Sequence, residues 1–121
     1  MRFPSDAVVY VATEPVNMQL SFDRLAAVVR DHLGEEPRSP VLVLFHNRRR
    51  TLVKALWHDG TGYCQFYKRL DRGTYRIPLA IPEGTSHVRV SRRELRLLLE
   101  GMDRALMRRA RRRVKRLRAE W

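Results

Sequence analysis

Residues 41–45 form an uninterrupted apolar run, Val-Leu-Val-Leu-Phe, in a chain of which 31% is charged. Successive side chains of a β-strand point to opposite faces of a sheet, so a strand that is apolar at every position needs cover on both faces. The run is far too short to span a membrane as a helix. The sequence therefore predicts a central strand that is buried on both faces.

Glycine and proline separate a series of short segments around this run. We expect these segments to be strands, because β-branched and aromatic residues favour a pleated, half-buried surface. Asp59-Gly60-Thr61-Gly62 supplies the glycines that a tight hairpin turn needs, and Asn47–Arg50 is expected to form a basic turn. The other expected strands are Ala7–Thr13, Thr51–His58, Tyr63–Leu70, Thr74–Pro78 and His87–Val90.

Two segments show the helical spacing of apolar residues. The first follows Ser21, a suitable N-cap, and ends at Gly34. The second begins at Ser91, which matches a capping box with Glu94. This order of elements indicates a single α+β domain, in which a mainly antiparallel sheet carries an N-terminal helix packed on it and a basic C-terminal helix. We divide the chain into an α+β domain at residues 1–103 and an Arg-rich helical tail at residues 104–121.

Positive charge is concentrated in two parts of the chain. Residues 104–121 hold nine of the 25 Lys and Arg residues and one acid, so they carry +8 of the net charge of +12. Residues 46–76 carry +6, whereas residues 1–45 sum to −2. Such blocks favour a polyanionic partner, and nucleic acid is the commonest one in a cell.

The C-terminal segment has an apolar face and a basic face if it is helical throughout, with apolar positions from Leu95 to Trp121. Such a helix suits nucleic acid, a membrane surface or a protein partner, and the pattern does not distinguish them. A plainer interpretation is that Leu95–Met102 packs on the sheet and the rest extends into solvent. The tail residues predicted to contact nucleic acid are Arg108, Arg111, Arg112, Lys115 and Arg118. Those predicted to contact a protein partner are Leu106, Val114, Leu117 and Trp121.

A second group of basic residues lies on the expected hairpins, interleaved with aromatic residues. Arginine forks onto phosphate oxygens or guanine edges, and exposed aromatic rings stack on bases. We nevertheless expect Trp57, Phe66 and Tyr75 to be mostly core. Lys68 and Arg69 are adjacent on one strand and should point to opposite faces. The hairpin residues predicted to bind nucleic acid are Arg48, Arg49, Arg50, Lys54, Lys68, Arg69 and Arg72.

Residue types that carry catalysis or bind metals lack the required spacing. The four His residues and Cys64 show no ligand spacing such as CxxC or HxxxH, and the acids form no constellation for two-metal phosphoryl transfer. The Asp59–Gly62 segment lacks the following helix and the Lys-Ser/Thr of a phosphate-binding loop. We therefore expect no enzyme, metal site, cofactor or small-molecule substrate. No signal peptide or membrane span is evident, so we expect a cytoplasmic protein without a membrane partner.

The string FHNRRRTLVKALWHDGTGYCQFYKRLDRGTYRIP at residues 45–78 resembles a known family pattern. That pattern has a Phe-x-Asn-Arg-Arg turn, a Trp followed by Asp-Gly-x-Gly, and a Tyr-Lys-Arg-Leu segment. It belongs to the TnpB, or second-open-reading-frame, accessory protein of the insertion-sequence family numbered sixty-six. Ala12–Val16 and Leu97–Gly101 extend the resemblance, which runs from about Val8 to Asp103. The chain departs from the family at Asn17 and Gln19, where Asp and Arg are usual, and at Arg24, where Gly is usual.

The resemblance implies a non-catalytic accessory role in DNA transposition, beside a separate and larger transposase. We expect DNA, in particular the ends of the insertion sequence, and the transposase of the same element as partners, in the nucleoid of a bacterial cell. The alternative is a protein-interaction module or chaperone of the transposase that does not bind DNA specifically. RNA binding, for instance to the transcript of the element, is a third possibility.

Overall fold

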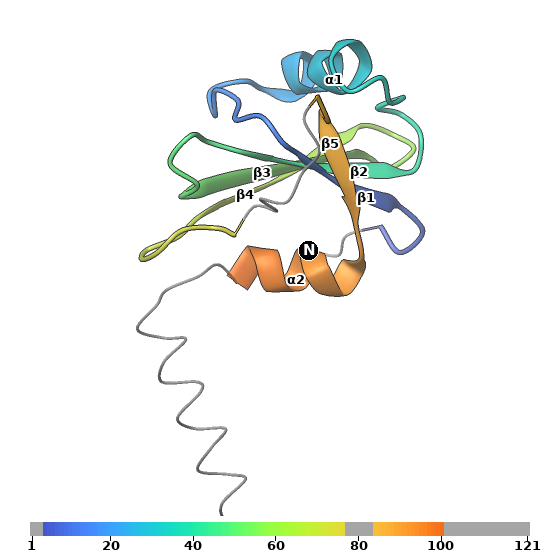
Figure 1. Cartoon of the computed structure of the whole chain (residues 1–121). Helices are drawn as coiled ribbons and strands as arrows, with labels where there is room; N and C mark the ends of the chain where they lie inside the picture. Colours follow the sequence, from blue (N-terminus) through green and yellow to red (C-terminus); the bar gives the residue numbers. More distant parts are fainter. Residues whose placement is uncertain (1–3, 77–83, 101–121) are drawn as a thin grey trace, which may run out of the picture.

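The computed structural model describes residues 4–76 and 84–100 of the 121-residue chain. Within these ranges, the chain forms five strands and two helices (Figure 1). The elements are β1 (Val8–Ala12), α1 (Phe22–Asp31), β2 (Val41–His46), β3 (Leu52–His58), β4 (Tyr63–Arg69), β5 (His87–Val90) and α2 (Arg92–Glu100).

The strands form one five-stranded sheet with the order β4-β3-β2-β1-β5. The pair β1–β2 is parallel and is connected through α1, whereas the other three neighbouring pairs are antiparallel. A parallel pair needs such a crossover connection, because a tight turn can only reverse the chain. The mainly antiparallel sheet and its two helices confirm the α+β expectation.

Strand β2 is buried at every position, which confirms the expectation for a central strand. Val41, Val43 and Phe45 belong to one apolar cluster, and Leu42 and Leu44 belong to another. This alternation follows from the two-residue period of a strand, which sends neighbouring side chains to opposite faces. Two separate apolar layers therefore meet at β2.

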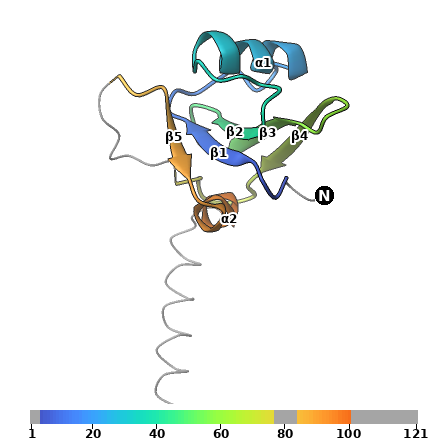
Figure 2. The ribbon, with the colours of Figure 1, turned by 90° about the vertical axis from the view of Figure 1, so that its right-hand side faces the viewer.

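The two helices cover opposite faces of the sheet (Figures 1 and 2). Helix α1 buries Leu25, Ala26 and Val29 in the cluster that contains Phe45. Helix α2 buries Leu95 and Leu98 in the cluster that contains Leu42 and Leu44. Each helix lies over the sheet as a separate layer, so β4 and β5 remain as the two edges.

Helix α1 begins after Ser21, as predicted, although the Ser21 side chain makes no capping hydrogen bond. Asp23 lies in the first turn, where a negative charge is favourable because the backbone N–H groups there lack acceptors. The helix ends at Asp31, and Gly34 adopts a left-handed φ of 69° just beyond it. That conformation is inexpensive for glycine and lets the chain leave the helix sharply.

Helix α2 has a reciprocal capping box. The Ser91 Oγ accepts from the Glu94 N–H at 3.1 Å, and a Glu94 carboxylate oxygen accepts from the Ser91 N–H at 3.1 Å. These bonds lower the pKa of the Glu94 carboxyl group, because they favour its charged form. At the other end, the Lys68 ammonium group donates to the Leu99 carbonyl at 2.8 Å. A cation at a helix C-terminus satisfies an otherwise free carbonyl and complements the helix dipole.

Two details of the expected elements need correction. The strand predicted at Thr74–Pro78 is not formed in its described part, where residues 74–76 contain an isolated bridge at Thr74. The Tyr75 N–H instead donates to the Arg50 carbonyl at 2.7 Å, so a contact with a turn replaces a strand ladder. In α2 the apolar positions predicted to face the sheet were Leu95 and Leu99, whereas the helix buries Leu95 and Leu98 and leaves Leu97 58% exposed.

The predicted tail at residues 104–121, with all its candidate contact residues, lies outside the described residues. The docking of Leu95–Met102 is described as far as residue 100. In residues 4–76 and 84–100, neither helix is long and apolar enough to cross a membrane.

We predict that Lys68→Met lowers the free energy of unfolding by about 1–2 kcal/mol, because the Leu99 carbonyl loses a charged donor at a half-buried site. Urea denaturation measures the change. Arg69→Met is the matched control, since Arg69 is exposed and makes no side-chain hydrogen bond in the described part of the chain. It should change the stability by less than about 0.5 kcal/mol. Equal losses in the two variants would show that Lys68 does not cap α2.

Candidate nucleic-acid interface

The turn between β2 and β3 is organised by the side chain of Asn47. Its Oδ1 accepts from the backbone N–H groups of Thr51 and Leu52, at 2.9 and 3.0 Å. Its Nδ2 donates to the Thr51 hydroxyl at 3.0 Å. The Arg50 N–H closes the turn by donating to the Asn47 carbonyl at 3.1 Å, which confirms the predicted turn. One amide side chain therefore fixes a loop that presents three consecutive arginines.

Arg50 adopts a left-handed backbone conformation, with a φ of 58°. This conformation is uncommon for a residue with a side chain, because Cβ crowds the backbone. Its carbonyl accepts from the Tyr75 N–H, and the Thr51 carbonyl accepts from the Leu70 N–H at 3.0 Å. These two bonds attach the segment that follows β4 to the β2–β3 turn.

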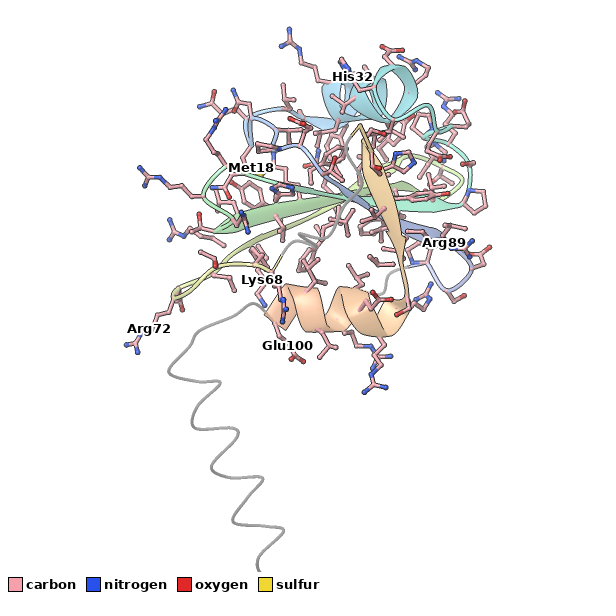
Figure 3. The ribbon with its side chains drawn as sticks, in the orientation of Figure 1. Met18, His32, Lys68, Arg72, Arg89 and Glu100 are labelled. Atoms are coloured by element: carbon pink, nitrogen blue, oxygen red, sulfur yellow. The ribbon has the colours of Figure 1, made fainter. Side chains whose placement is uncertain are left out.

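Six arginines thus gather at one end of the sheet, on the β2–β3 turn, the last residue of β4 and the segment after it. We call this group the arginine end. Figure 1 shows the turn and the segment after β4 on the same side of the molecule, and Figure 3 shows Arg72 projecting outward there. The arginine end consists of Arg48, Arg49, Arg50, Arg69, Arg72 and Arg76.

The guanidinium groups of the arginine end have no polar partner within the described ranges. The ion pairs among residues 4–76 and 84–100 are Arg30–Asp31 and His87–Glu35, which involve none of the six. Asp71 lies among them in sequence but pairs with no arginine in those ranges. Five of the six are exposed and Arg50 is half-buried. A guanidinium group has five N–H donors, so the arginine end offers a dense set of donors to an anion.

Lys54 was predicted to bind nucleic acid, but the structure places it inside the fold with only 6% of its surface exposed. Its ammonium group donates to the Leu20 carbonyl at 3.0 Å and lies 4.9 Å from the centre of the Tyr67 ring. It therefore joins the segment before α1 to the sheet. We leave Lys54 out of the interface, because its charge is already engaged.

Lys68 and Arg69 point to opposite faces of the sheet, as expected for neighbours on a strand. Lys68 faces the α2 layer, where it donates to Leu99, whereas Arg69 is exposed. We leave Lys68 out of the interface for the same reason as Lys54. The carbonyl acceptors of Lys54 and Lys68 lie 34 and 31 residues away in the sequence, so local sequence patterns do not predict either contact.

The aromatic residues that flank the basic positions are mainly core residues. Trp57 is 5% exposed and Tyr75 is 1% exposed, which confirms the expectation for both. Burial raises the pKa of Tyr75 to about 12. Phe66 is half-buried and packs against the cluster under α2. Tyr67 differs from these three, because 51% of its surface is exposed.

The Asp59–Gly62 segment forms the turn between β3 and β4, as predicted, and the Asp59 N–H donates to the Gly62 carbonyl at 3.0 Å. The Asp59 carboxylate accepts from the N–H groups of Thr61 and Gly62 and from the Thr61 hydroxyl, at 2.8–3.0 Å. These bonds lower the Asp59 pKa to about 2. Burial and the nearby Asp59 charge raise the pKa of the Cys64 thiol, which opposes a nucleophilic role.

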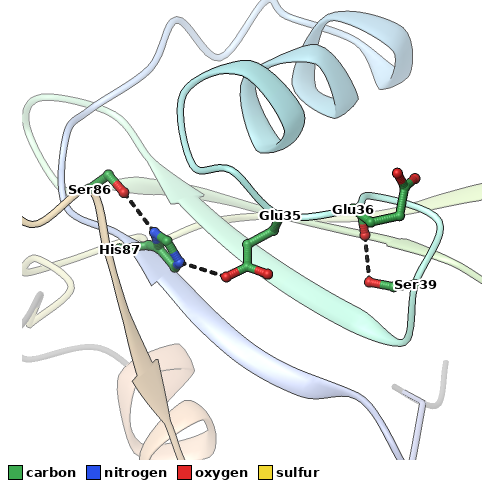
Figure 4. Close-up of polar contacts among 5 residues, drawn as sticks. All are labelled: Glu35, Glu36, Ser39, Ser86 and His87. Carbon is green, nitrogen blue, oxygen red and sulfur yellow. Dashed lines mark hydrogen bonds and ion pairs between the residues drawn. The ribbon is translucent and has the colours of Figure 1, made fainter.

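Ser86, His87 and Glu35 form a hydrogen-bonded chain that sequence analysis missed (Figure 4). The Ser86 hydroxyl lies 2.7 Å from His87 Nδ1, and His87 Nε2 lies 3.0 Å from a Glu35 carboxylate oxygen. Glu35 follows α1 and His87 begins β5, so the chain ties two elements that are 52 residues apart. The bond from Ser86 orients the His87 ring, and the bond from His87 to Glu35 links the two segments. We interpret the group as a structural link.

The three family departures lie together before and at the start of α1. Asn17, Gln19 and Arg24 line one depression on the surface. The Asn17 Oδ1 accepts from the Gln19 N–H at 2.9 Å, a role that an aspartate would also fill. An exchange of Asp for Asn at residue 17 would therefore retain this hydrogen bond and remove one negative charge.

His and Cys residues do not assemble with acids into a metal site: among residues 4–76 and 84–100, no group of three or more His, Cys, Asp or Glu side chains is placed to hold a metal ion.

We predict that Asn47→Ala lowers the free energy of unfolding by about 1–3 kcal/mol, because two backbone N–H groups lose their acceptor. Thermal or urea unfolding measures the effect. Asn17→Ala is the matched control, since Asn17 accepts one exposed N–H group and should cost less. Asn47→Asp retains the acceptor and should recover much of the stability. If Asn47→Ala were no worse than Asn17→Ala, the turn would not depend on Asn47.

Comparison with known proteins gives the family. Residues 7–116 match the family described as IS66 Orf2-like protein. The uncharacterized protein y4hO of Sinorhizobium fredii is 39% identical over 95 residues, which cover 78% of this chain and 80% of that protein. The uncharacterized protein y4jC of the same species is 29% identical over 95 residues, covering 78% and 79%. No solved structure matches the chain. Because the family match spans most of the sequence, this protein belongs to the IS66 Orf2-like family of transposition-associated accessory proteins.

Proposed function

We propose that the protein is a non-catalytic accessory factor of DNA transposition that binds DNA through the arginine end and the basic tail. It assists a separate transposase, which carries out the strand chemistry. The family membership supports the association with transposition. The DNA contact is our own inference, and it would place the protein at the nucleoid in the cytoplasm of a bacterial cell.

The observation that carries this proposal is the set of six arginines without an acidic partner in the described ranges. Arginine forks onto phosphate oxygens in two parallel hydrogen bonds. Three of the six lie on a turn that the Asn47 side chain holds in place. The backbone of this turn therefore loses little conformational entropy when an anion binds. Each phosphate that the protein neutralises releases counterions, which favours binding at low salt.

The tail extends the proposed DNA contact, although it lies outside the described residues. Arg108, Arg111, Arg112, Lys115 and Arg118 are proposed to bind further phosphates. The apolar tail residues Leu106, Val114, Leu117 and Trp121 are proposed to contact the transposase.

A second candidate function is a docking module for the transposase that makes no specific contact with DNA. Leu97 favours it, because this large apolar residue is 58% exposed on α2, the helix that precedes the tail. In this case the arginine end would face an acidic surface of the transposase.

The test removes three charges from the arginine end and, separately, three from the opposite edge. The first variant is Arg48→Gln/Arg49→Gln/Arg50→Gly, where glycine suits the left-handed backbone at residue 50. The control is Arg89→Gln/Arg92→Gln/Arg93→Gln, whose residues are exposed on β5 and α2. Arg89 lies on the far side of the molecule from Arg72 (Figure 3).

We predict that the first variant binds a duplex of the terminal repeat at least about 10-fold more weakly, since a hydrogen bond to a charged group contributes about 1.5 kcal/mol or more. The slope of log affinity against log salt should become shallower by up to about 2.7, at about 0.9 per phosphate contact. Fluorescence anisotropy at several salt concentrations measures both. Equal losses of DNA affinity in the two variants would show that the protein binds DNA only as a nonspecific polycation. Unchanged DNA binding with weaker capture of the transposase would favour the docking module.

A further inference from the structure

We propose that Tyr67 is a stacking site for an unpaired nucleobase, so that the protein recognises single-stranded or locally opened DNA beside the arginine end. This inference rests on the proposed DNA binding and adds the form of DNA that is bound. It concerns a residue that lies outside the arginine end.

Tyr67 is exposed where an ordinary core aromatic would be buried. Its exposed fraction is 51%, whereas Trp57 and Tyr75 are exposed by 5% and 1%. The large apolar or aromatic residues that are exposed in the described ranges are Phe22, Tyr67 and Leu97. Of these, Tyr67 alone shares a strand with a member of the arginine end, Arg69.

The ring of Tyr67 is held from within the fold. Lys54 lies directly opposite on β3, and its ammonium group is 4.9 Å from the centre of the ring. That ammonium group is itself fixed by its bond to the Leu20 carbonyl at 3.0 Å. A cation over one face of an aromatic ring attracts it and restricts its orientation. The ring is therefore arranged before any ligand arrives, while half of its surface remains open to one.

The positive charges near the Tyr67 ring could bind the phosphates of a nucleotide strand whose base stacks on the ring. Arg69 is two residues further along β4 and points to the same face as Tyr67, about 7 Å away along the strand. Its register partner is Leu52, and the β2–β3 turn with Arg48–Arg50 lies just beyond. A base on the ring thus leaves its neighbouring phosphates within reach of arginine donors.

An exposed aromatic ring beside basic residues is typical of proteins that bind single strands. Every base has a π face, so stacking tolerates any sequence. In a duplex, the base faces are already stacked on one another, and a protein reaches them only by opening the helix. A protein partner would also contact an exposed tyrosine, but the adjacent arginines favour a polyanion.

The test compares binding of a labelled oligo-dT of about 15 nucleotides with binding of the matching dT·dA duplex, by fluorescence anisotropy at fixed salt. The variants are Tyr67→Ala and Tyr67→Phe. Leu97→Ala is the control, since it removes an exposed apolar side chain from the α2 layer on the other face of the sheet. Tyr67→Ala should weaken binding to the single strand by about 5- to 150-fold, with Tyr67→Phe and Leu97→Ala close to the parent protein.

A second measurement uses the parent protein, so its result does not depend on whether a variant folds. In the full-length parent protein, oligo-dT should shift the NMR signals of the Tyr67 ring protons upfield, as a stacked base does through its ring current. Duplex binding that depends on Arg48–Arg50, without any effect of Tyr67→Ala or any ring shift, would overturn the stacking site and retain the proposed function. Loss of transposase capture alone in Tyr67→Ala would assign the ring to a protein partner. Failure to bind either DNA probe would overturn both proposals.

Discussion

Burial of β2 on both faces is the constraint on which the rest of this structure depends. Because Leu42 and Leu44 point to one side and Val41, Val43 and Phe45 to the other, each face of the sheet needs its own apolar cover. Helix α1 supplies one layer and α2 the other. A small domain that uses both helices in this way has few places left for function, which are the sheet edges and the ends of its strands.

The basic residues divide according to this architecture. Lys54 and Lys68 sit on neighbouring strands, face opposite layers and donate to carbonyls of Leu20 and Leu99. A buried or half-buried charge needs such a partner, because removal from water is costly. Five of the six arginines of the arginine end are exposed to water, and none of the six has an acidic partner within the described ranges. Within the described residues, Lys54 and Lys68 therefore stabilise the fold, whereas the arginine end is accessible to the proposed partner.

Sequence periodicity and turn residues predict most of the fold, because they report local preferences. The central strand, the Asn47–Arg50 turn and the Ser91–Glu94 capping box all follow from residues close in sequence. Contacts between distant segments are not encoded in this way. The expected strand at Thr74 gives way to the bond between Tyr75 and Arg50, and the link from His87 to Glu35 spans 52 residues. The Lys54 ammonium group has its acceptor at Leu20, 34 residues away, so the sequence around Lys54 predicts only a surface charge.

Mapping the DNA contact on the full-length protein tests the assignment of the arginine end most directly. A duplex carrying the terminal repeat of the element would be titrated into the ¹⁵N-labelled chain and followed by amide chemical shifts. Among residues 4–76 and 84–100, we expect the largest shifts at Asn47–Thr51 and at residues 69–76, with little change at Arg89–Arg93. Shifts centred on β5 and the start of α2, with the β2–β3 turn unaffected, would contradict the assignment of the arginine end.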